Sequence, residues 1–257
     1  MNVSTRPTQM AGVSAEEWRV RCDLAALYRL VAHHRMTDWI YTHISARLPG
    51  PGHHFLINQY GVLFDEMRAS DLVKIDLDGN IVQDGAASRQ VNTAGFVIHS
   101  AIHMARHDLM CVIHTHTAAG IAVSAQKHGL LPISQHALKF YGHLGYHGYE
   151  GIALDIDERT RLVQDLGEHQ AMILQNHGLL AAGRTIPEAW HNIHYLERAC
   201  QAQVQALAGG SELVFPPEEV RRHTAAQFHR EGSLEHYEMA WASALRMIEG
   251  GRSDWRC

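Results

Sequence analysis

Apolar side chains recur at helical spacing in five segments of this chain, and two of these segments open with a capping box. Ser14 and Glu17 form the first box. Thr185 and Glu188 form the second, and the helix that follows is expected to end near Ala208. The other three helices are predicted over about 91–106, 157–168 and 234–248.

Short runs typical of β-strands lie between these helices. Three runs are bounded by Gly, Pro or Asp-Gly, and two are continuous apolar runs that indicate strands buried on both faces. The bounded runs are 42–47, 54–58 and 72–77, and the continuous runs are 109–113 and 171–174.

The order of these elements indicates one main domain. We expect a flexible tail over residues 1–13, a single domain over 14–208 and, over 209–257, a linker and a C-terminal helix that packs on the same domain. Glycines at 209–210 and prolines at 216–217 mark the linker.

Histidines follow the two strands that are predicted to be buried. His114 and His116 come after the first strand, and on an extended chain two side chains at this spacing leave by the same face. His177 follows the second strand. Three neutral imidazoles with one open position are typical of a catalytic zinc-like centre. Because the chain has 21 histidines, ordinary core or surface histidines are the alternative interpretation.

Composition narrows the classes of function. With 22 Lys+Arg, 27 Asp+Glu and no basic cluster, the net charge of −5 argues against nucleic-acid binding. No apolar run reaches the roughly 18 residues of a membrane span. The four cysteines are far apart and form no C-x-x-C pair, which favours a reduced compartment. We therefore expect a cytoplasmic protein that binds neither nucleic acid nor a membrane.

Several motifs then occur in the order found in one known superfamily. The segments THTAAGIAVSA, ILQNHGLLAAG, NTAGFVIHSAIHMAR and GLLPISQHAL lie within about 55–208, and this span resembles the class II aldolase and adducin superfamily, most closely the adducin heads and their bacterial relatives. The resemblance implies an α/β fold, a three-layer α/β/α sandwich with a central mixed sheet, assembled as a homotetramer with active sites at subunit boundaries. It also implies that His114, His116 and His177 bind one divalent metal ion, usually zinc and in some relatives manganese or another ion.

One position departs from the pattern of the sugar-phosphate aldolases that the chain resembles. They carry a proton-shuttling glutamate 19 residues before the first histidine, and this chain has Gly95 there. No Asp or Glu lies between Asp84 and Asp108. The standard acid–base residue of the aldol reaction is therefore missing.

Three histidines are candidates to replace it. His99 and His103 lie one and two helical turns after Gly95 and could share its face. His136 lies close to where some relatives place a tyrosine that reaches a neighbouring subunit's site. For His99 and His103, simple packing in the core or exposure on the surface is the alternative.

The segments that bind phosphate in those aldolases are also altered in this chain, where Gly61 alone is unchanged. The residues present could bind a carboxylate, so a small hydroxy or keto acid, or a dihydroxylated aromatic acid, fits better than a sugar phosphate. The candidate substrate-binding residues are His43, Ser45, Gly61, Arg89, Asn92 and Thr93.

Two functions from different classes follow. The first is a metal-dependent carbon–carbon lyase, an aldolase or a decarboxylase, that acts on a small-molecule substrate. The second is a non-catalytic scaffold like the adducin heads, which join actin and spectrin assemblies, although this chain lacks their long basic tail. The residues leave open the substrate, the metal, the reaction type and the group that replaces the glutamate.

Overall fold

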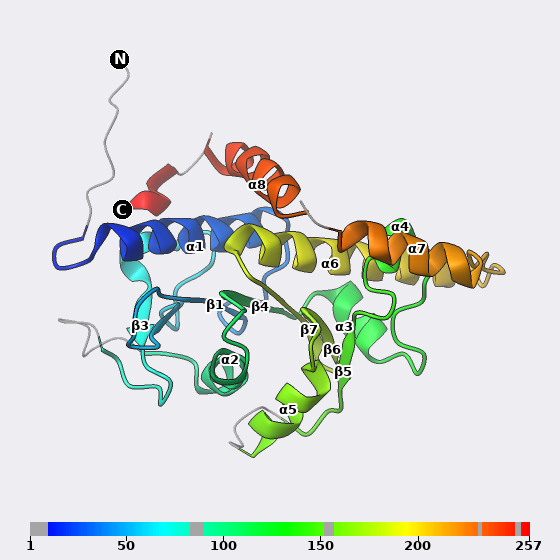
Figure 1. Cartoon of the computed structure of the whole chain (residues 1–257), viewed down its shortest axis with the longest axis horizontal. Coiled ribbons are helices and arrows are strands. Elements are labelled where there is room, and N and C mark those ends of the chain that lie inside the picture. The colour runs from blue at the N-terminus through cyan, green and yellow to red at the C-terminus, as the bar shows by residue number, and fades with distance from the viewer. Residues whose placement is uncertain (1–9, 83–89, 152–156, 231–232, 250–252) are drawn as a thin grey trace.

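A mixed sheet of seven strands lies at the centre of the fold in the part of the chain that the structure describes (Figure 1). The structure is a computed structural model, which describes residues 10–82, 90–151, 157–230, 233–249 and 253–257. The strand order is β3-β2-β1-β4-β7-β6-β5, and every neighbouring pair is antiparallel except β5 and β6. The strands are β1 His43–Arg47, β2 Phe55–Ile57, β3 Val73–Ile75, β4 Cys111–Thr115, β5 Gly145–His147, β6 Ala171–Leu174 and β7 Gly178–Gly183.

Helices cover both faces of this sheet. Helices α1, α6 and α8 lie on one side and α2 and α5 on the other (Figure 1), so the fold is the three-layer α/β/α sandwich that the resemblance implied. The helices are α1 Ala15–His33, α2 Thr93–Ala105, α3 Ala118–Ser124, α4 Gln135–Leu138, α5 Glu158–Leu166, α6 Ile186–Ala208, α7 Glu218–Phe228 and α8 Ser233–Glu249, with the 3₁₀ helices η1 Ala69–Asp71 and η2 Ser253–Arg256.

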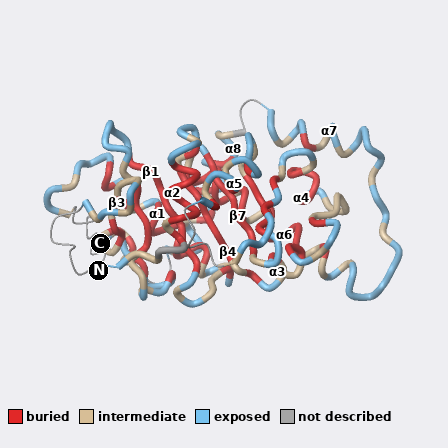
Figure 2. Tube along the Cα trace, turned by 90° about the horizontal axis from the view of Figure 1, so that it is seen from below, coloured by how far each residue is buried: buried red, intermediate tan, exposed pale blue. Residues whose placement is uncertain are grey.

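The central strands are buried on both faces, as the continuous apolar runs predict. Cys111 and Ile113 of β4 enter the core cluster that includes α1 and α6, whereas Val112 enters the cluster beneath α2 and α5. Because successive strand side chains point to opposite faces, each layer of helices receives alternate residues of the same strand. Burial is therefore continuous through the centre of the molecule, shown in red in Figure 2.

Several elements do not follow from the sequence pattern, among them β7 and α7. Strand β7 has the sequence GLLAAG, whose glycines and alanines carry little strand signal, yet all six residues are buried because neighbours surround them. Helix α7 begins directly after Pro217 and buries only Ala225 among its residues, so it shows no apolar face of the kind that predicts a helix. Figure 2 shows this exposed segment in pale blue.

The ends of the described chain pack on the same body. Met10 and Val13 contact the main core cluster, and residues 1–9 of the predicted tail lie outside the described residues. Helix α8 contributes Trp241 to that cluster, and the 3₁₀ helix η2 contributes Trp255. Among the described residues, no helix combines the length and the apolar character that crossing a membrane requires.

A buried ion-pair network ties α1 to β3. Arg21 is fully buried and donates to Glu17 Oε1 at 2.8 Å, while Lys74 Nζ donates to Glu17 Oε2 at 2.8 Å. Burial alone would raise the pKa of Glu17, but the hydrogen bonds from Lys74 and Arg21 outweigh it and hold this pKa below its usual value. The ionised carboxylate therefore stabilises the folded state at neutral pH, and that contribution is lost as the pH falls through the folded pKa.

We expect Glu17→Gln to lower the free energy of unfolding at neutral pH by about 3 kcal/mol, because the substitution removes the carboxylate charge that faces the buried Arg21. Urea denaturation at neutral pH, and again below the pKa of the folded carboxyl, measures this difference. It should shrink at the lower pH, and Glu16→Gln, at the exposed neighbouring position, should have little effect at either. A difference that stays the same at both pH values would contradict the role assigned to the Glu17 charge.

Candidate metal centre

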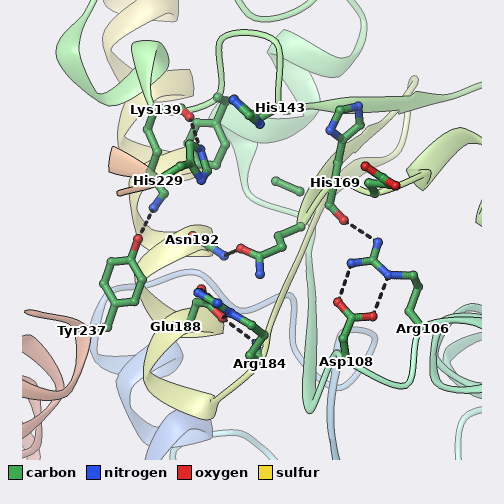
Figure 3. Close-up of a pocket in the computed structure, with 14 residues that line it drawn as sticks. Arg106, Asp108, Lys139, His143, His169, Arg184, Glu188, Asn192, His229 and Tyr237 are labelled. Atoms are coloured by element: carbon green, nitrogen blue, oxygen red, sulfur yellow. Dashed lines mark hydrogen bonds and ion pairs between the residues drawn. The ribbon is translucent and has the colours of Figure 1, made fainter. Parts of the chain in front are cut away.

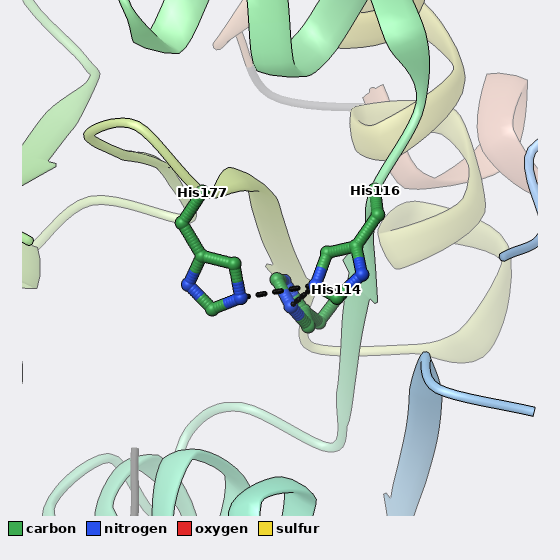
Figure 4. Close-up of side chains that lie close together, drawn as sticks. All are labelled: His114, His116 and His177. Atoms are coloured by element: carbon green, nitrogen blue, oxygen red, sulfur yellow. Dashed lines mark hydrogen bonds between the residues drawn. The ribbon is translucent and has the colours of Figure 1, made fainter. Parts of the chain in front are cut away.

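The sheet topology brings the three predicted ligands to one edge. Strands β4 and β6 are both antiparallel to β7, which lies between them, so β4 and β6 run in the same direction and their carboxyl ends meet. His114 lies on β4, His116 directly follows it, and His177 lies in the turn from β6 to β7. Their side chains converge (Figure 4), and one nitrogen from each lies within 4.8 Å of the others.

Hydrogen bonds fix the ring orientation of two of these histidines. Nδ1 of His114 donates to the carbonyl oxygen of Leu179 at 3.0 Å, and Nδ1 of His116 donates to Oδ2 of Asp38 at 3.0 Å. Since a carbonyl and a carboxylate only accept, each neutral ring carries its lone pair on Nε2. The second partner of each ring therefore selects the tautomer that can bind a metal.

The two lone pairs point at each other, which is the main observation in favour of a cation. Nε2 of His114 lies 2.8 Å from Nε2 of His116, and the latter lies 3.0 Å from Nε2 of His177. A tetrahedral zinc site with Zn–N bonds of about 2.0–2.1 Å separates its nitrogens by about 3.3 Å, a few tenths of an ångström more. A divalent ion would remove the repulsion between facing lone pairs, so the donor set fits the metal that the resemblance implies.

Burial keeps the imidazoles of His114 and His177 in the neutral form that metal binding requires. It lowers the pKa of His114 well below its usual value, with further lowering by His43 and the other two ligands. It lowers the pKa of His177 to about 4, with smaller contributions from His116 and His147. His114 is buried, whereas His116 and His177 are half-exposed, so the site opens on one side where a substrate could approach.

The turn between β6 and β7 places His177. Asn176 adopts φ +55°, a left-handed conformation that asparagine tolerates better than most residues, and its N–H donates to Ser124 at 3.1 Å. At Gly178 an added Cβ would lie 2.4 Å from the carbonyl oxygen of Thr115. Gly178 therefore lets β7 start close against the end of β4, beside His116.

The ring of His43 occupies the space beside the metal ligands that a side chain at position 95 would enter. His43 on β1 is the register partner of His114 on β4, and the two ring centroids are 5.0 Å apart. A Cβ added at Gly95 would lie 2.6 Å from Cδ2 of His43. The absence of a glutamate at position 95 and the presence of His43 are therefore sterically linked.

Behind His43, predicted residues form a buried polar chain. Nδ1 of His43 contacts Nε2 of His99 at 2.8 Å, and Oγ of Ser45 contacts His99 Nδ1 at 2.5 Å and His103 Nε2 at 2.7 Å. All four are buried between β1 and α2. Burial lowers the pKa of His43 and His99 well below the usual value of an imidazole, and that of His103 to about 3. Among the described residues, His99 and His103 thus connect to the candidate metal ligands through His43.

The other predicted residues that the structure describes lie on different segments of the chain. His136 on α4 packs its ring against Tyr195, with centroids 4.7 Å apart. Gly61 lies in a turn after β2 with φ +92°, Asn92 precedes α2 and Thr93 is its first residue. Arg89 lies outside the described residues. Their roles toward a substrate stay predictions.

The structure also places side chains near the centre that the sequence pattern did not single out. Asp38 is 78 residues from His116, and no periodic signal marks it. A small cavity beside His177 is lined by His147, Glu150 and Glu158, among others. His147 binds Asp165 at 2.7 Å, so carboxylates lie near the centre on elements other than the helix that contains Gly95.

Comparison with known proteins places this geometry in a family. Residues 22–204 match the profile of the class II aldolase and adducin N-terminal domain. The chain belongs to this family. The resemblance seen in the motifs is thereby confirmed.

Similar proteins include both members named as aldolases and members named as adducins. An aldolase II superfamily protein from Pseudomonas syringae is 55% identical, with a TM-score of 0.90 over 95% of this chain and 98% of that one. An L-fuculose 1-phosphate aldolase from Glaciozyma antarctica is 28% identical, with a TM-score of 0.83 over 98% and 97%. Alpha-adducin of Rattus norvegicus is 47% identical over 190 residues, which are 74% of this chain but 26% of the adducin.

Proposed function

We propose that this protein is a divalent-metal-dependent carbon–carbon lyase of the aldolase or decarboxylase type. The observation that carries the proposal is the set of three imidazoles whose Nε2 atoms converge, two of them in a tautomer that leaves the Nε2 lone pair free. Membership of the class II aldolase family and the likeness to an L-fuculose 1-phosphate aldolase support it. A bound zinc ion, or manganese or another divalent ion, would supply a Lewis acid that polarises a substrate carbonyl or a vicinal hydroxyl pair.

The residues of this chain would bind the ion, orient its ligands and transfer protons. His114, His116 and His177 would hold the ion through Nε2, while the Leu179 carbonyl and the Asp38 carboxylate keep two of the rings oriented. His43 fills the space of the missing glutamate side chain and is our candidate for the group that exchanges a proton with substrate. His99 and His103 would act as positioning residues, because they reach the site through His43.

The proposed substrate is a small hydroxy or keto acid, or a dihydroxylated aromatic acid. The substrate-binding candidates offer hydroxyl, imidazole, amide and guanidinium donors, which suit a carboxylate. We further propose that the protein is a cytoplasmic homotetramer in which His136 reaches the site of a neighbouring subunit. In one chain, His136 lies on α4 and the metal centre lies at the carboxyl ends of β4 and β6.

A second function is favoured by two observations. Gly95 offers no carboxylate for proton transfer, and the chain is 47% identical to alpha-adducin over 190 residues. The alternative is therefore a non-catalytic scaffold with an adducin-like head. Such a protein could keep the three histidines for stability alone. The two functions differ in whether turnover depends on the metal.

Turnover assays on metal-loaded protein separate the two. Purified protein loaded with zinc, manganese or cobalt is incubated with hydroxy, keto and catechol acids, and aldehyde and CO₂ release are measured. We expect release that requires the metal, is abolished in His177→Ala and is unchanged in His128→Ala, an exposed histidine away from the centre. No turnover with any acid, together with actin co-sedimentation that survives chelation, would replace the enzyme by the scaffold.

A further inference from the structure

A second cleft, whose lining residues are drawn in Figure 3, lies at the ends of β4 and β7 that face away from the metal centre. Asp108 lies before β4 and Arg184 directly after β7, so the cleft is at the beginning of β4 and the end of β7, whereas the metal ligands are at the other ends of these strands. His177 and Arg184 flank the six residues of β7, which places them roughly 20 Å apart. The cleft encloses about 270 Å³.

Two of the three permanent cations that line this cleft are paired with carboxylates. Arg106 binds Asp108 at 2.7 Å and also donates to the carbonyl oxygens of Gly167 and His169. Arg184 binds Glu188 at 2.7 Å. Within each pair the positive and the negative charge largely cancel. The third cation is therefore the charge in the cleft that can attract an anion.

Lys139 is that third cation, and it has no carboxylate within 4.0 Å among the described residues. Its residue is 1% exposed, and its Nζ contacts the hydroxyl of Tyr237 at 3.1 Å. The rings of Tyr237, Phe228 and Tyr195 surround the ammonium, with centroids 4.9, 5.6 and 5.9 Å away. Cation–π contacts offset part of the cost of burial, but one phenol satisfies one of three N–H donors.

Among the other titratable groups of the cleft, Glu188 raises the pKa of Lys139, but its carboxylate is bound by Arg184. His143 and His229 stack with centroids 4.2 Å apart, and burial lowers the pKa of both, so they stay neutral at pH 7 and can donate or accept. Glu168 is exposed at the edge. Burial lowers the pKa of Lys139 to about 8, which leaves most of the ammonium charged at pH 7.

We propose that this cleft is a binding site for a small anion with a carboxylate or phosphate group, held by the Lys139 ammonium. Of the three carboxylates that line the cleft, Asp108 and Glu188 are paired with arginines and Glu168 is exposed at the edge, so the desolvated ammonium can give an anion a charge-assisted hydrogen bond of low solvent screening. Its volume suits a small metabolite rather than a polymer. The site is separate from the metal centre and does not depend on the proposed lyase activity.

Isothermal titration calorimetry at pH 7 tests this site with two probes, inorganic phosphate and acetate, in separate arms. The protein is first treated with chelator, so that neither probe can bind a metal ion at the three histidines. Binding of phosphate assigns a phosphate ligand, and binding of acetate alone assigns a carboxylate. Binding of neither probe overturns the proposal.

Variants assign the binding to Lys139. Lys139→Met keeps an apolar chain within the aromatic rings and should weaken binding at least about tenfold. Lys127→Met makes the same charge change at an exposed position and should leave binding unchanged. Glu168→Gln removes a carboxylate from the exposed edge and should strengthen binding about two- to fivefold, a result that does not depend on whether Lys139→Met folds.

Two results would contradict the assignment. The first is wild-type affinity in a folded Lys139→Met protein, with Glu168→Gln also unchanged. The second is binding that appears only after metal is restored, which would place the anion at the histidines. Lys139-dependent binding of equal affinity in chelated and metal-loaded protein is the expected outcome, whether or not the loaded metal adds a second binding event.

Discussion

Replacement of His116 by alanine is expected to lower the affinity for zinc by at least about a hundredfold, since it removes one of three ligands and the imidazole that faces both of the others. The turnover that we propose should disappear with the metal. Competition with a chromogenic chelator measures the affinity directly. Far-ultraviolet circular dichroism of the same sample shows whether the variant is folded.

A graded series makes this expectation more specific. Asp38→Asn keeps the size of the side chain but weakens its hold on Nδ1 of His116, and should cost about 10- to 100-fold in zinc affinity. His128→Ala, at an exposed position, should cost nothing. If His116→Ala binds zinc as tightly as the wild type, His116 is not a ligand and the assignment of the centre is wrong.

Gly95→Ala is expected to lower the free energy of unfolding by about 1–3 kcal/mol, although alanine is the better helix former. The added methyl group would lie 2.6 Å from Cδ2 of His43, and this ring is held between His99 and the proposed metal ligand His114. The ring must therefore move or the helix must shift. Urea denaturation of wild type and variant gives the difference.

Two controls show whether His43 is the cause. In a His43→Ala background the same Gly95→Ala change should cost less than about 1 kcal/mol, because the obstructing ring is gone. Gly148→Ala adds a methyl group whose nearest neighbour, Gln175, is 3.9 Å away, and should change stability by less than about 0.5 kcal/mol. Equal costs in both backgrounds would contradict the steric link between positions 43 and 95.

The fold could be predicted from sequence where apolar residues are continuous or periodic. Strands β4 and β6 follow from their uninterrupted apolar runs, and α1 and α6 follow from capping boxes and an apolar face. The sequence of β7 has no such signal, because the burial of its small residues is decided by the strands and helices around it. The layer order came from the resemblance, since periodicity does not say which strands are neighbours.

The candidate site can be predicted where a metal-binding residue type lies at the end of a predicted buried strand. His114, His116 and His177 are identifiable because they lie at the ends of buried apolar runs, and the parallel direction of β4 and β6 then brings them together. Asp38 could not be found, because its contact with His116 exists only after the chain folds. Lys139 gave no signal for the same reason, since the three rings around it come from α6, α7 and α8.

The metal content of the purified protein tests most directly whether three imidazoles hold one divalent ion. Inductively coupled plasma mass spectrometry of wild-type protein and His114→Ala, purified side by side, gives the ratio of metal to chain. We expect about one divalent ion per chain in the wild type and almost none in the variant. A folded wild-type protein that holds no divalent metal, even after incubation with zinc and manganese, would contradict the metal centre and the lyase that depends on it.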